Sequence, residues 1–409
     1  MNRIADRLGL RVRRPRMAAF LAAVLLGAVL ASLGLGWQQD PPPEGRAADR
    51  RSPIVSSGGV TARPTTPTTV AKPAGPPGRS CAEVAAGLTP RQRLAQLLMV
   101  GVDPSRVEPA IELAGSVGIG GIFLGGNDTA LLVDNRLAAV RAAAAVPLAV
   151  SVDDEGGRVQ RVDRLDGSVP SARMMAASMT VEDVHALARD RGAALRARGV
   201  TIDFAPVVDV TEQPDDDVIG DRSFGSDPAV VTRYAGAFAQ GLSEGGVLPV
   251  VKHFPGHGHA SGDSHVSAVT TPGLADLRKV DLVPYRQLLG ARPTAVMVGH
   301  MDVPGLTGGR PASLSPATYQ LLRGEFSFNG VVLTDDLGGM QAVSGRYPLP
   351  QAVLTALTSG ADIAFWSSGE RVEEVLGVLE RALADHRLPA ERVNVALGRV
   401  LRAKAACTG

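Results

Sequence analysis

The chain has 409 residues, of which 45% are hydrophobic and 20% charged, and its formal net charge is +1. This length and composition are sufficient for one large globular domain or two smaller ones. The near-neutral charge gives no basic surface of the kind that binds a phosphate backbone, which argues against nucleic acid as a partner.

The first 37 residues predict an export signal or an N-terminal membrane anchor. Residues 1–16 contain six arginines and one acidic residue, and no charged residue occurs from 17 to 37. A basic flank followed by an apolar run is typical of an export signal. The run is also long enough to span a bilayer, so the sequence is consistent both with cleavage after Ala31 and with a retained anchor.

Residues 38–80 are rich in Pro, Thr, Ser and Gly, which predicts a disordered or extended tether. The only two cysteines, Cys81 and Cys407, bracket the remaining region, which we expect to fold as one domain over 81–409. A disulfide between them would join the ends of that domain and would persist in an oxidising compartment. The alternative is that both thiols are unpaired. The sequence does not give the distance between the two cysteines, which would decide whether they can bond.

Eight short apolar runs follow, separated by Ala- and Leu-rich segments. They lie at 97–103, 121–126, 147–153, 201–210, 248–254, 294–300, 330–336 and 361–367. Continuously apolar runs of this length are typical of parallel strands that are covered on both faces. The segments 134–145 and 181–199 are examples of the helices expected between them.

Eight alternating strand and helix units in this length predict an α/β fold of the (β/α)8 TIM-barrel type, with a single catalytic domain. A doubly wound open sheet is the alternative. No G-x-G-x-x-G segment opens a helix directly after a strand, so the usual glycine signature of that alternative is missing.

Nearly every predicted strand ends in a polar or ionisable residue. These are Asp103, Asp153, Asp209, Lys252 with His253, His300, Asp335 with Asp336, and Trp366 with Ser367. In a barrel such residues converge on the C-terminal mouth, where catalysis takes place. Any one of them could instead cap a helix or a turn.

The segment 252–265, KHFPGHGHASGDSH, holds four of the seven histidines. Its glycines and proline predict a loop. Clustered imidazoles could form a zinc site. Alternatively, Asp263 could orient His265, two residues later, for acid/base chemistry.

The segment resembles the signature of the β-N-acetylglucosaminidase branch of glycoside hydrolase family 3. Three further segments support the resemblance: 153–161 (DDEGGRVQR), 220–224 (GDRSF) and 333–337 (LTDDL). All four occur in the family's order, and the resemblance covers residues from about 90 to 405. It implies that Asp335 is the nucleophile and His265 the general acid and base, with Asp263 as its partner. It also implies that the sugar is bound by Asp153, Arg161, Arg222, Lys252 and His253, and that neither a metal nor a cofactor is needed.

The chemistry of these residue types agrees with the implied roles. Retaining glycoside hydrolysis needs a carboxylate below the anomeric carbon and a proton donor beside the leaving oxygen. Histidine, with a reference pKa of about 6.5, can donate and then accept a proton near neutrality. An aspartate can fix the tautomer of such a histidine and favour its imidazolium form.

Several neighbouring residues have other expected roles. Adjacent Asp335 and Asp336 could act as a pair on the acetamido group of the substrate. Successive strand residues point to opposite faces, however, so we interpret Asp336 as structural. We expect Arg158 to form a structural ion pair and His257 to shape its loop through a hydrogen bond. His259 is expected to be exposed. His300 and Asp302 are expected to lie near the pocket, without an assigned role. Trp366 is expected either to stack on a sugar or to fill the core.

The predicted function is retaining hydrolysis of terminal β-linked N-acetylglucosamine from peptidoglycan fragments (muropeptides) outside the membrane. We expect a monomeric enzyme that is exported and associated with the cell envelope, either anchored in the membrane or secreted. The alternatives are a family 3 β-glucosidase, a phosphorylase in which phosphate replaces water, a zinc hydrolase and a non-catalytic wall-binding module. The export segment and the family analogy together support the choice of substrate.

Overall fold

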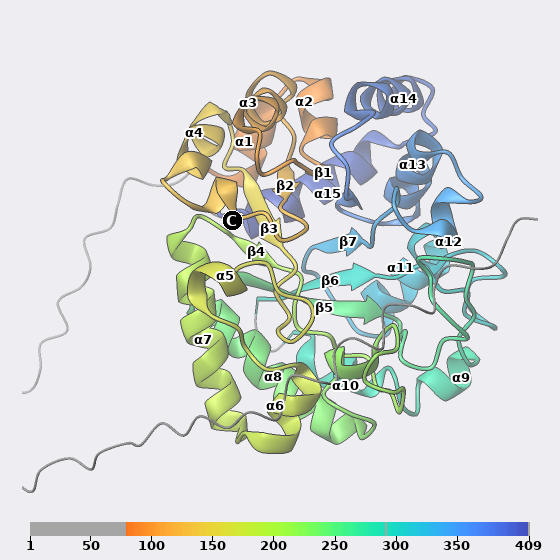
Figure 1. Cartoon of the computed structure of the whole chain (residues 1–409). Helices are drawn as coiled ribbons and strands as arrows, with labels where there is room; N and C mark the ends of the chain where they lie inside the picture. Colours follow the sequence, from red (N-terminus) through yellow and green to blue (C-terminus); the bar gives the residue numbers. More distant parts are fainter. Residues whose placement is uncertain (1–78, 291–292, 408–409) are drawn as a thin grey trace, which may run out of the picture. The chain divides into compact units, whose positions relative to one another are not determined.

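The computed structural model describes residues 79–290 and 293–407 (Figure 1). The predicted export segment, 1–37, and nearly all of the predicted tether, 38–80, lie outside these residues. Among the described residues, no helix combines the length and apolarity needed to cross a membrane.

Eight parallel strands form one sheet in the order β7-β6-β5-β4-β3-β2-β1-β8. Their bounds are β1 Leu98–Gly101, β2 Gly121–Phe123, β3 Ala149–Val152, β4 Ile202–Asp203, β5 Leu248–Phe254, β6 Ala295–Val298, β7 Val332–Thr334 and β8 Ala364–Trp366. A parallel bridge between Leu333 and Ile363 joins β7 to the start of β8. The predicted (β/α)8 barrel is therefore confirmed, and the open-sheet alternative is wrong.

Helices surround the strands (Figure 1). They are α1 Cys81–Ala86, α2 Pro90–Ala95, α3 Val107–Glu112, α4 Arg136–Ala143, α5 Asp163–Asp166, α6 Ala172–Ser178, α7 Val181–Ala197, α8 Pro228–Glu244, α9 Leu274–Leu277, α10 Val283–Leu288, α11 Pro316–Gly324, α12 Gln341–Ser344, α13 Leu349–Ser359, α14 Val372–Ala384 and α15 Ala390–Ala403, with short turns η1 Leu113–Val117, η2 Ala130–Leu132, η3 Gly220–Arg222 and η4 Ala312–Leu314. The helices predicted at 134–145 and 181–199 are confirmed as α4 and α7. A capping box in which Thr180 and Asp183 bond each other's backbone N–H defines the start of α7.

All eight strands lie within the predicted runs, but β4 is much shorter than its run at 201–210. Pro206 has no N–H to donate to a neighbouring strand, so the ladder stops before it. A single bridge between Val207 and Lys252 keeps the following residues beside β5. Asp209 is thereby brought next to the end of β5.

The barrel interior contains an aromatic layer below its C-terminal mouth. Phe123 and Phe204 stack with ring centroids 5.4 Å apart, and Phe365 packs edge-on against both, at 5.0 and 5.2 Å. Together with Met297 these side chains come from β2, β6, β8 and the end of β4. Alternate strands supply one layer of a TIM-barrel core in this way.

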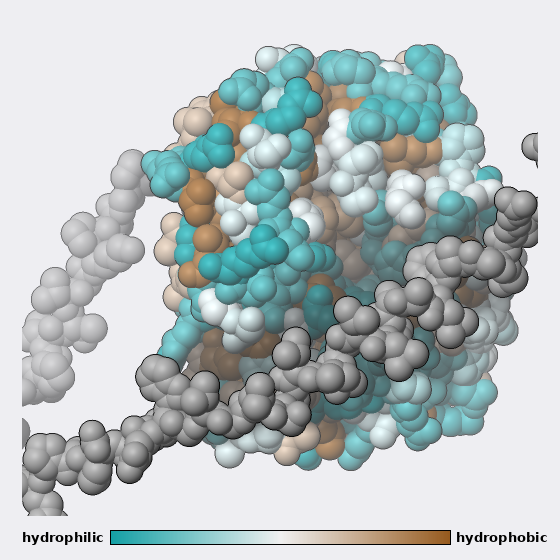
Figure 2. Space-filling view, viewed as in Figure 1, coloured by the Kyte–Doolittle hydropathy of each residue, from teal (hydrophilic) through white to brown (hydrophobic). Residues whose placement is uncertain are grey.

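The outer surface is mainly hydrophilic on the face drawn in Figure 2. Large hydrophobic side chains are exposed at Met174, Val266 and Val395 in the part of the chain that the structure describes. Isolated exposed apolar residues are normal on a soluble domain.

Of the two alternatives that the sequence left open for the cysteines, the structure has the disulfide: Cys81, the first residue of α1, is bonded to Cys407, which follows α15. The end of α15 lies at the N-terminal side of the barrel, because Lys404 Nζ donates to the carbonyl of Gly120, just before β2, at 3.3 Å. The disulfide is therefore at the opposite end of the barrel from the strand termini that carry the predicted catalytic residues.

We predict that the C81S/C407S variant is less stable to unfolding by about 2–5 kcal/mol, because the crosslink closes a loop of 326 residues and restricts the unfolded chain. Urea unfolding with and without a reductant measures the effect. Equal unfolding midpoints for the oxidised and reduced protein would contradict it.

Candidate active site

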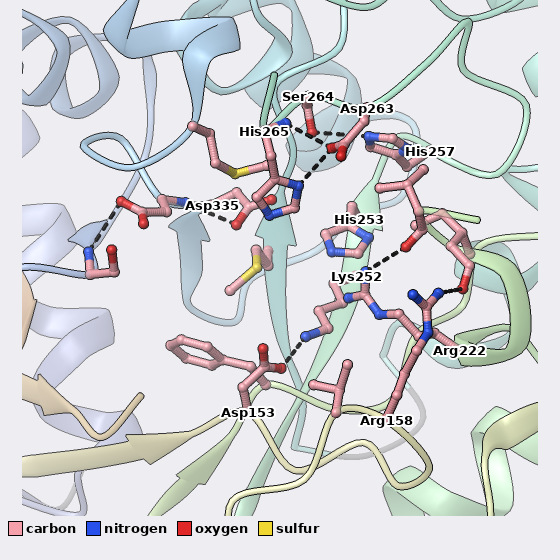
Figure 3. Close-up of a pocket in the computed structure, with 18 of the residues that line it drawn as sticks. Asp153, Arg158, Arg222, Lys252, His253, His257, Asp263, Ser264, His265 and Asp335 are labelled. Atoms are coloured by element: carbon pink, nitrogen blue, oxygen red, sulfur yellow. Dashed lines mark hydrogen bonds and ion pairs between the residues drawn. The ribbon is translucent and has the colours of Figure 1, made fainter. Parts of the chain in front are cut away.

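A cavity of about 550 Å³ lies at the C-terminal ends of the strands (Figure 3). Its volume falls within the range of small-ligand pockets, roughly 300–1,000 Å³. Each residue that the sequence analysis placed in the site lines it: Asp153, Arg161, Arg222, Lys252, His253, Asp263, His265 and Asp335. The structure thus brings all eight together from strand β5 and from the segments that follow β3, β4, β5 and β7.

Asp335 directly follows β7 and is held by backbone contacts. Its N–H donates to the carbonyl of Val298 at 2.9 Å, and its Oδ1 accepts from the N–H of Asp336 at 2.9 Å. Burial alone would raise the pKa of Asp335, but His253, His300 and other nearby donors hold that pKa below its usual range. The carboxylate is therefore kept ionised, as a nucleophile requires.

The neighbouring Asp336 has a structural role, as predicted. Its Oδ1 accepts three backbone N–H groups, from Gly338 and Gly339 at 2.9 Å and from Ser367 at 3.1 Å. His300, for which no role was expected, lies between Ser313 Oγ at 2.7 Å and the carbonyl of Asp336 at 2.9 Å. His300 therefore fixes the backbone that carries both aspartates.

Asp263 and His265 lie together on the loop after β5. Asp263 Oδ1 is 2.7 Å from His265 Nδ1 and accepts the backbone N–H of His265 at 2.8 Å. Burial by itself would raise the pKa of Asp263, but its hydrogen bonds from His265 lower it overall. With Nδ1 engaged by an ionised carboxylate, Nε2 is the nitrogen left to exchange a proton with a ligand. Figure 3 shows His265 turned towards the same cavity as Asp335.

The opposite wall holds a buried network of charges. Lys252 Nζ lies 2.5 Å from carboxylate oxygens of both Asp153 and Glu155. Arg222 forms a two-pronged ion pair with Glu155, with both nitrogen–oxygen distances at 2.7 Å. Arg161 lies 3.7 Å from Asp153. The wall therefore presents both donors and acceptors at fixed positions, as sugar hydroxyls require.

Sequence reasoning missed Glu155, which is the central carboxylate of this network and is 5% exposed. Burial would raise its pKa, but Arg222 and Lys252 hold the pKa of Glu155 well below its ordinary value. Burial raises the pKa of Asp153, against the opposing effect of Lys252. The two-residue spacing from Asp153 to Glu155 could have indicated that Glu155 belongs to the site, because alternate residues of an extended segment point to the same side.

A second missed residue is Asp209, which the sequence analysis noted only as a strand-end acid. It is fully buried. Its Oδ2 is 2.7 Å from His253 Nδ1, and its Oδ1 accepts the backbone N–H of His257 at 2.7 Å. Asp209 therefore sets the orientation of His253.

Of the residues with other expected roles, Arg158 makes the predicted structural ion pair, with Asp221 at 2.8 Å. His257 forms a hydrogen bond within its loop and His259 is exposed, both as expected; His259 also pairs with Asp281, at 2.9 Å. Trp366 is fully buried and belongs to the core. The histidines of 253–265 thus turn to separate partners. Within 79–290 and 293–407, no three His, Cys, Asp or Glu side chains converge as a metal site would need.

Comparison with known proteins identifies relatives over most of the chain. Residues 89–403 match the family described as "Glycosyl hydrolase family 3 N terminal domain". A beta-hexosaminidase, LpqI of Mycobacterium tuberculosis, is 52% identical over 363 residues, which cover 86% of this chain and 92% of that protein.

Two solved structures agree with the fold. A glycosyl hydrolase of the GH3 family from Mycobacterium smegmatis is 54% identical with a TM-score of 0.77, and the match covers 79% of this chain and 99% of that one. A glycoside hydrolase family 3 beta-N-acetylglucosaminidase from Paenibacillus sp. is 32% identical with a TM-score of 0.73, over 79% of this chain and 64% of that one.

We predict that E155Q lowers the free energy of unfolding by roughly 3–5 kcal/mol. The substitution removes the carboxylate charge that pairs with both Arg222 and Lys252, and these two cations remain buried. The control is E373Q, since Glu373 pairs with Arg91 at the surface with 70% of its side chain exposed. Urea unfolding of both variants is the measurement. Equal stability of E155Q and E373Q would show that the network is not under this constraint.

A second prediction concerns pH. Burial, followed by the charge of His253, lowers the pKa of His257 to about 4. In the unfolded chain this histidine takes up a proton near pH 6.5. Between about pH 6.5 and about pH 4 the unfolded state therefore binds more protons than the folded state. The free energy of unfolding then falls by up to ~1.4 kcal/mol for each unit by which the pH is lowered. Unfolding of the wild type and of H257N at several pH values tests this. The same pH dependence in both proteins would contradict it.

Proposed function

The chain belongs to glycosyl hydrolase family 3, and we propose that it is a retaining β-N-acetylglucosaminidase that removes terminal, non-reducing β-linked N-acetylglucosamine. The family predicted from the four sequence segments is confirmed, and the chain is accordingly a glycoside hydrolase. The observation that carries the proposal is the position of Asp335 and the Asp263–His265 pair in one cavity at the barrel mouth.

In the first step, Asp335 attacks the anomeric carbon while the bond from that carbon to the leaving oxygen breaks. His265 Nε2 gives its proton to the leaving oxygen, and Asp263 supports the resulting imidazole through Nδ1. In the second step His265 takes a proton from water, the water oxygen attacks the same carbon, and the ester to Asp335 breaks. Two displacements at one carbon retain its configuration.

Sugar recognition is assigned to the charged wall opposite Asp335. Lys252, Arg161 and Arg222 offer donors, Asp153 offers an acceptor, and His253 lies between this wall and the nucleophile. The choice of N-acetylglucosamine is supported by the relatives named beta-hexosaminidase and beta-N-acetylglucosaminidase. Charge-assisted hydrogen bonds of this kind fix the orientation of a sugar ring.

We infer that the natural substrates are peptidoglycan fragments outside the cytoplasmic membrane. The basic flank and apolar run at 1–37 support export or anchoring, and 38–80 would act as a tether between the membrane and the catalytic domain. The Cys81–Cys407 disulfide is consistent with an oxidising compartment. The scattered pattern of exposed apolar side chains in the described residues supports a monomer.

We predict that the purified protein hydrolyses aryl β-N-acetylglucosaminides at least ten times faster than aryl β-glucosides. D335N should lower kcat/KM on the order of 10³-fold or more, because it removes the nucleophile. D336N should keep most of the activity, since an Asn oxygen can still accept the three backbone N–H groups.

Steady-state kinetics of the three proteins on both aryl glycosides checks these expectations. A preference for the glucoside would overturn the sugar assignment. Equal losses in D335N and D336N would instead indicate that the two carboxylates act together on the acetamido group.

A further inference from the structure

The loop at 261–268, which carries the catalytic pair, has one buried residue. Ser264 is 1% exposed, whereas the side chains of Asp263 and His265 on either side are 39% and 58% exposed. The remaining residues of 261–268 are exposed. Ser264 is therefore the residue of 261–268 whose side chain packs against the barrel.

The side chain of Ser264 forms a hydrogen bond with the ring of His257. Its Oγ lies 3.1 Å from His257 Nε2. Among the described residues this is the one hydrogen bond of the His257 ring, because its buried Nδ1 has no partner there. Figure 3 shows the two side chains meeting on the side of the cavity next to Asp263. Burial makes the ring neutral at neutral pH by lowering the pKa of His257. The bond to Ser264 thus joins two uncharged, buried groups.

His257 itself belongs to a rigid part of the site. Its backbone N–H donates to the buried Asp209 at 2.7 Å, and Thr211 Oγ1 donates to the carbonyl of the next residue, Gly258, at 2.7 Å. A Cβ atom at Gly258 would lie 2.0 Å from the carbonyl oxygen of Val210, so the two segments are in direct contact. His257 is consequently fixed to the same aspartate that orients His253.

Backbone hydrogen bonds attach the loop to the segment that follows the nucleophile. The carbonyls of Ser264 and His265 accept from the N–H groups of Ala342 and Gln341, at 3.1 and 3.2 Å. These donors are the first two residues of α12, which follows β7 and Asp335. The side-chain bond to His257 and these two backbone bonds together place His265 over the end of β7.

We propose that the His257–Ser264 hydrogen bond is a latch that holds the loop bearing Asp263 and His265 in its catalytic position. His257 and Ser264 are positioning residues, since they act on the substrate through His265. The inference rests on the proposed function, in which His265 protonates the leaving group. It adds two residues to that function, and neither of them is required for the chemistry itself.

If the latch is broken, the loss of activity should depend on the leaving group of the substrate. A phenolate of high pKa needs a proton from His265, whereas 2,4-dinitrophenolate leaves without one. Breaking the latch should therefore slow hydrolysis of phenyl β-N-acetylglucosaminide and leave hydrolysis of the dinitrophenyl glycoside nearly unchanged in its first step. A general structural defect would slow both substrates equally.

The experiment compares S264A, H257F and the double variant with the wild type on both substrates. H257F keeps a ring in the same place and removes the nitrogen that contacts Ser264. S267A is the matched control, because Ser267 is an exposed serine on the same loop. H265A provides the reference for complete loss of the acid.

For the phenyl glycoside we expect kcat/KM to fall roughly 5- to 100-fold in S264A and in H257F, the range that a lost hydrogen bond and an unpaired buried group allow. The fall in kcat/KM of the double variant should be no larger than that of the less active single variant, since both substitutions break the same hydrogen bond. S267A should match the wild type. Azide should accelerate turnover of the dinitrophenyl glycoside by H265A, because the anion replaces the water that His265 would activate.

Full activity of S264A and H257F, equal losses on both substrates, or losses that multiply in the double variant would each overturn the latch. If H265A hydrolyses the phenyl glycoside at the wild-type rate, the acid/base assignment fails and the latch fails with it. If H265A is impaired and S264A is not, the latch alone is wrong. The two failures are therefore distinguishable.

Discussion

Closure of the parallel sheet between β7 and β8 is the constraint on which the site depends. Because all eight strands run in the same direction, their C-terminal ends meet at one mouth, and residues far apart in the sequence share one cavity. Lys252 and His253 lie near the end of β5, Asp153 follows β3, and Asp335 follows β7. The aromatic layer below them fills the barrel and keeps these side chains at the mouth.

The buried charges have a common arrangement. Three carboxylates around the cavity are bonded to basic side chains or to backbone N–H groups: Glu155 to Arg222 and Lys252, Asp209 to the ring of His253 and the backbone N–H groups of His253 and His257, and Asp336 to three backbone N–H groups. Such compensation makes the burial of charge tolerable, because a lone buried ion is very costly. Asp335 differs from them in its smaller set of partners, which leaves its carboxylate facing the cavity and available to a ligand.

Much of this could be predicted from the sequence. The eight apolar runs predicted eight strands, and the order of the four family segments predicted which residues share the site. The partners of these residues could not be predicted. Glu155 and Asp209 bond to residues far away in the chain, and β4 ends early because Pro206 interrupts the ladder. The burial of Ser264 inside an otherwise exposed loop also depends on the tertiary position of His257, which a local pattern does not encode.

In the proposed mechanism, Asp335 forms an ester with the sugar. The most direct measurement is mass spectrometry of peptides from the protein after reaction with a 5-fluoro-N-acetylglucosaminyl fluoride, a donor that slows the second displacement. We predict one added sugar on the peptide that contains Asp335, and none in D335N. Turnover of natural substrate without any labelled peptide, or a label on a different carboxylate, would contradict the assignment.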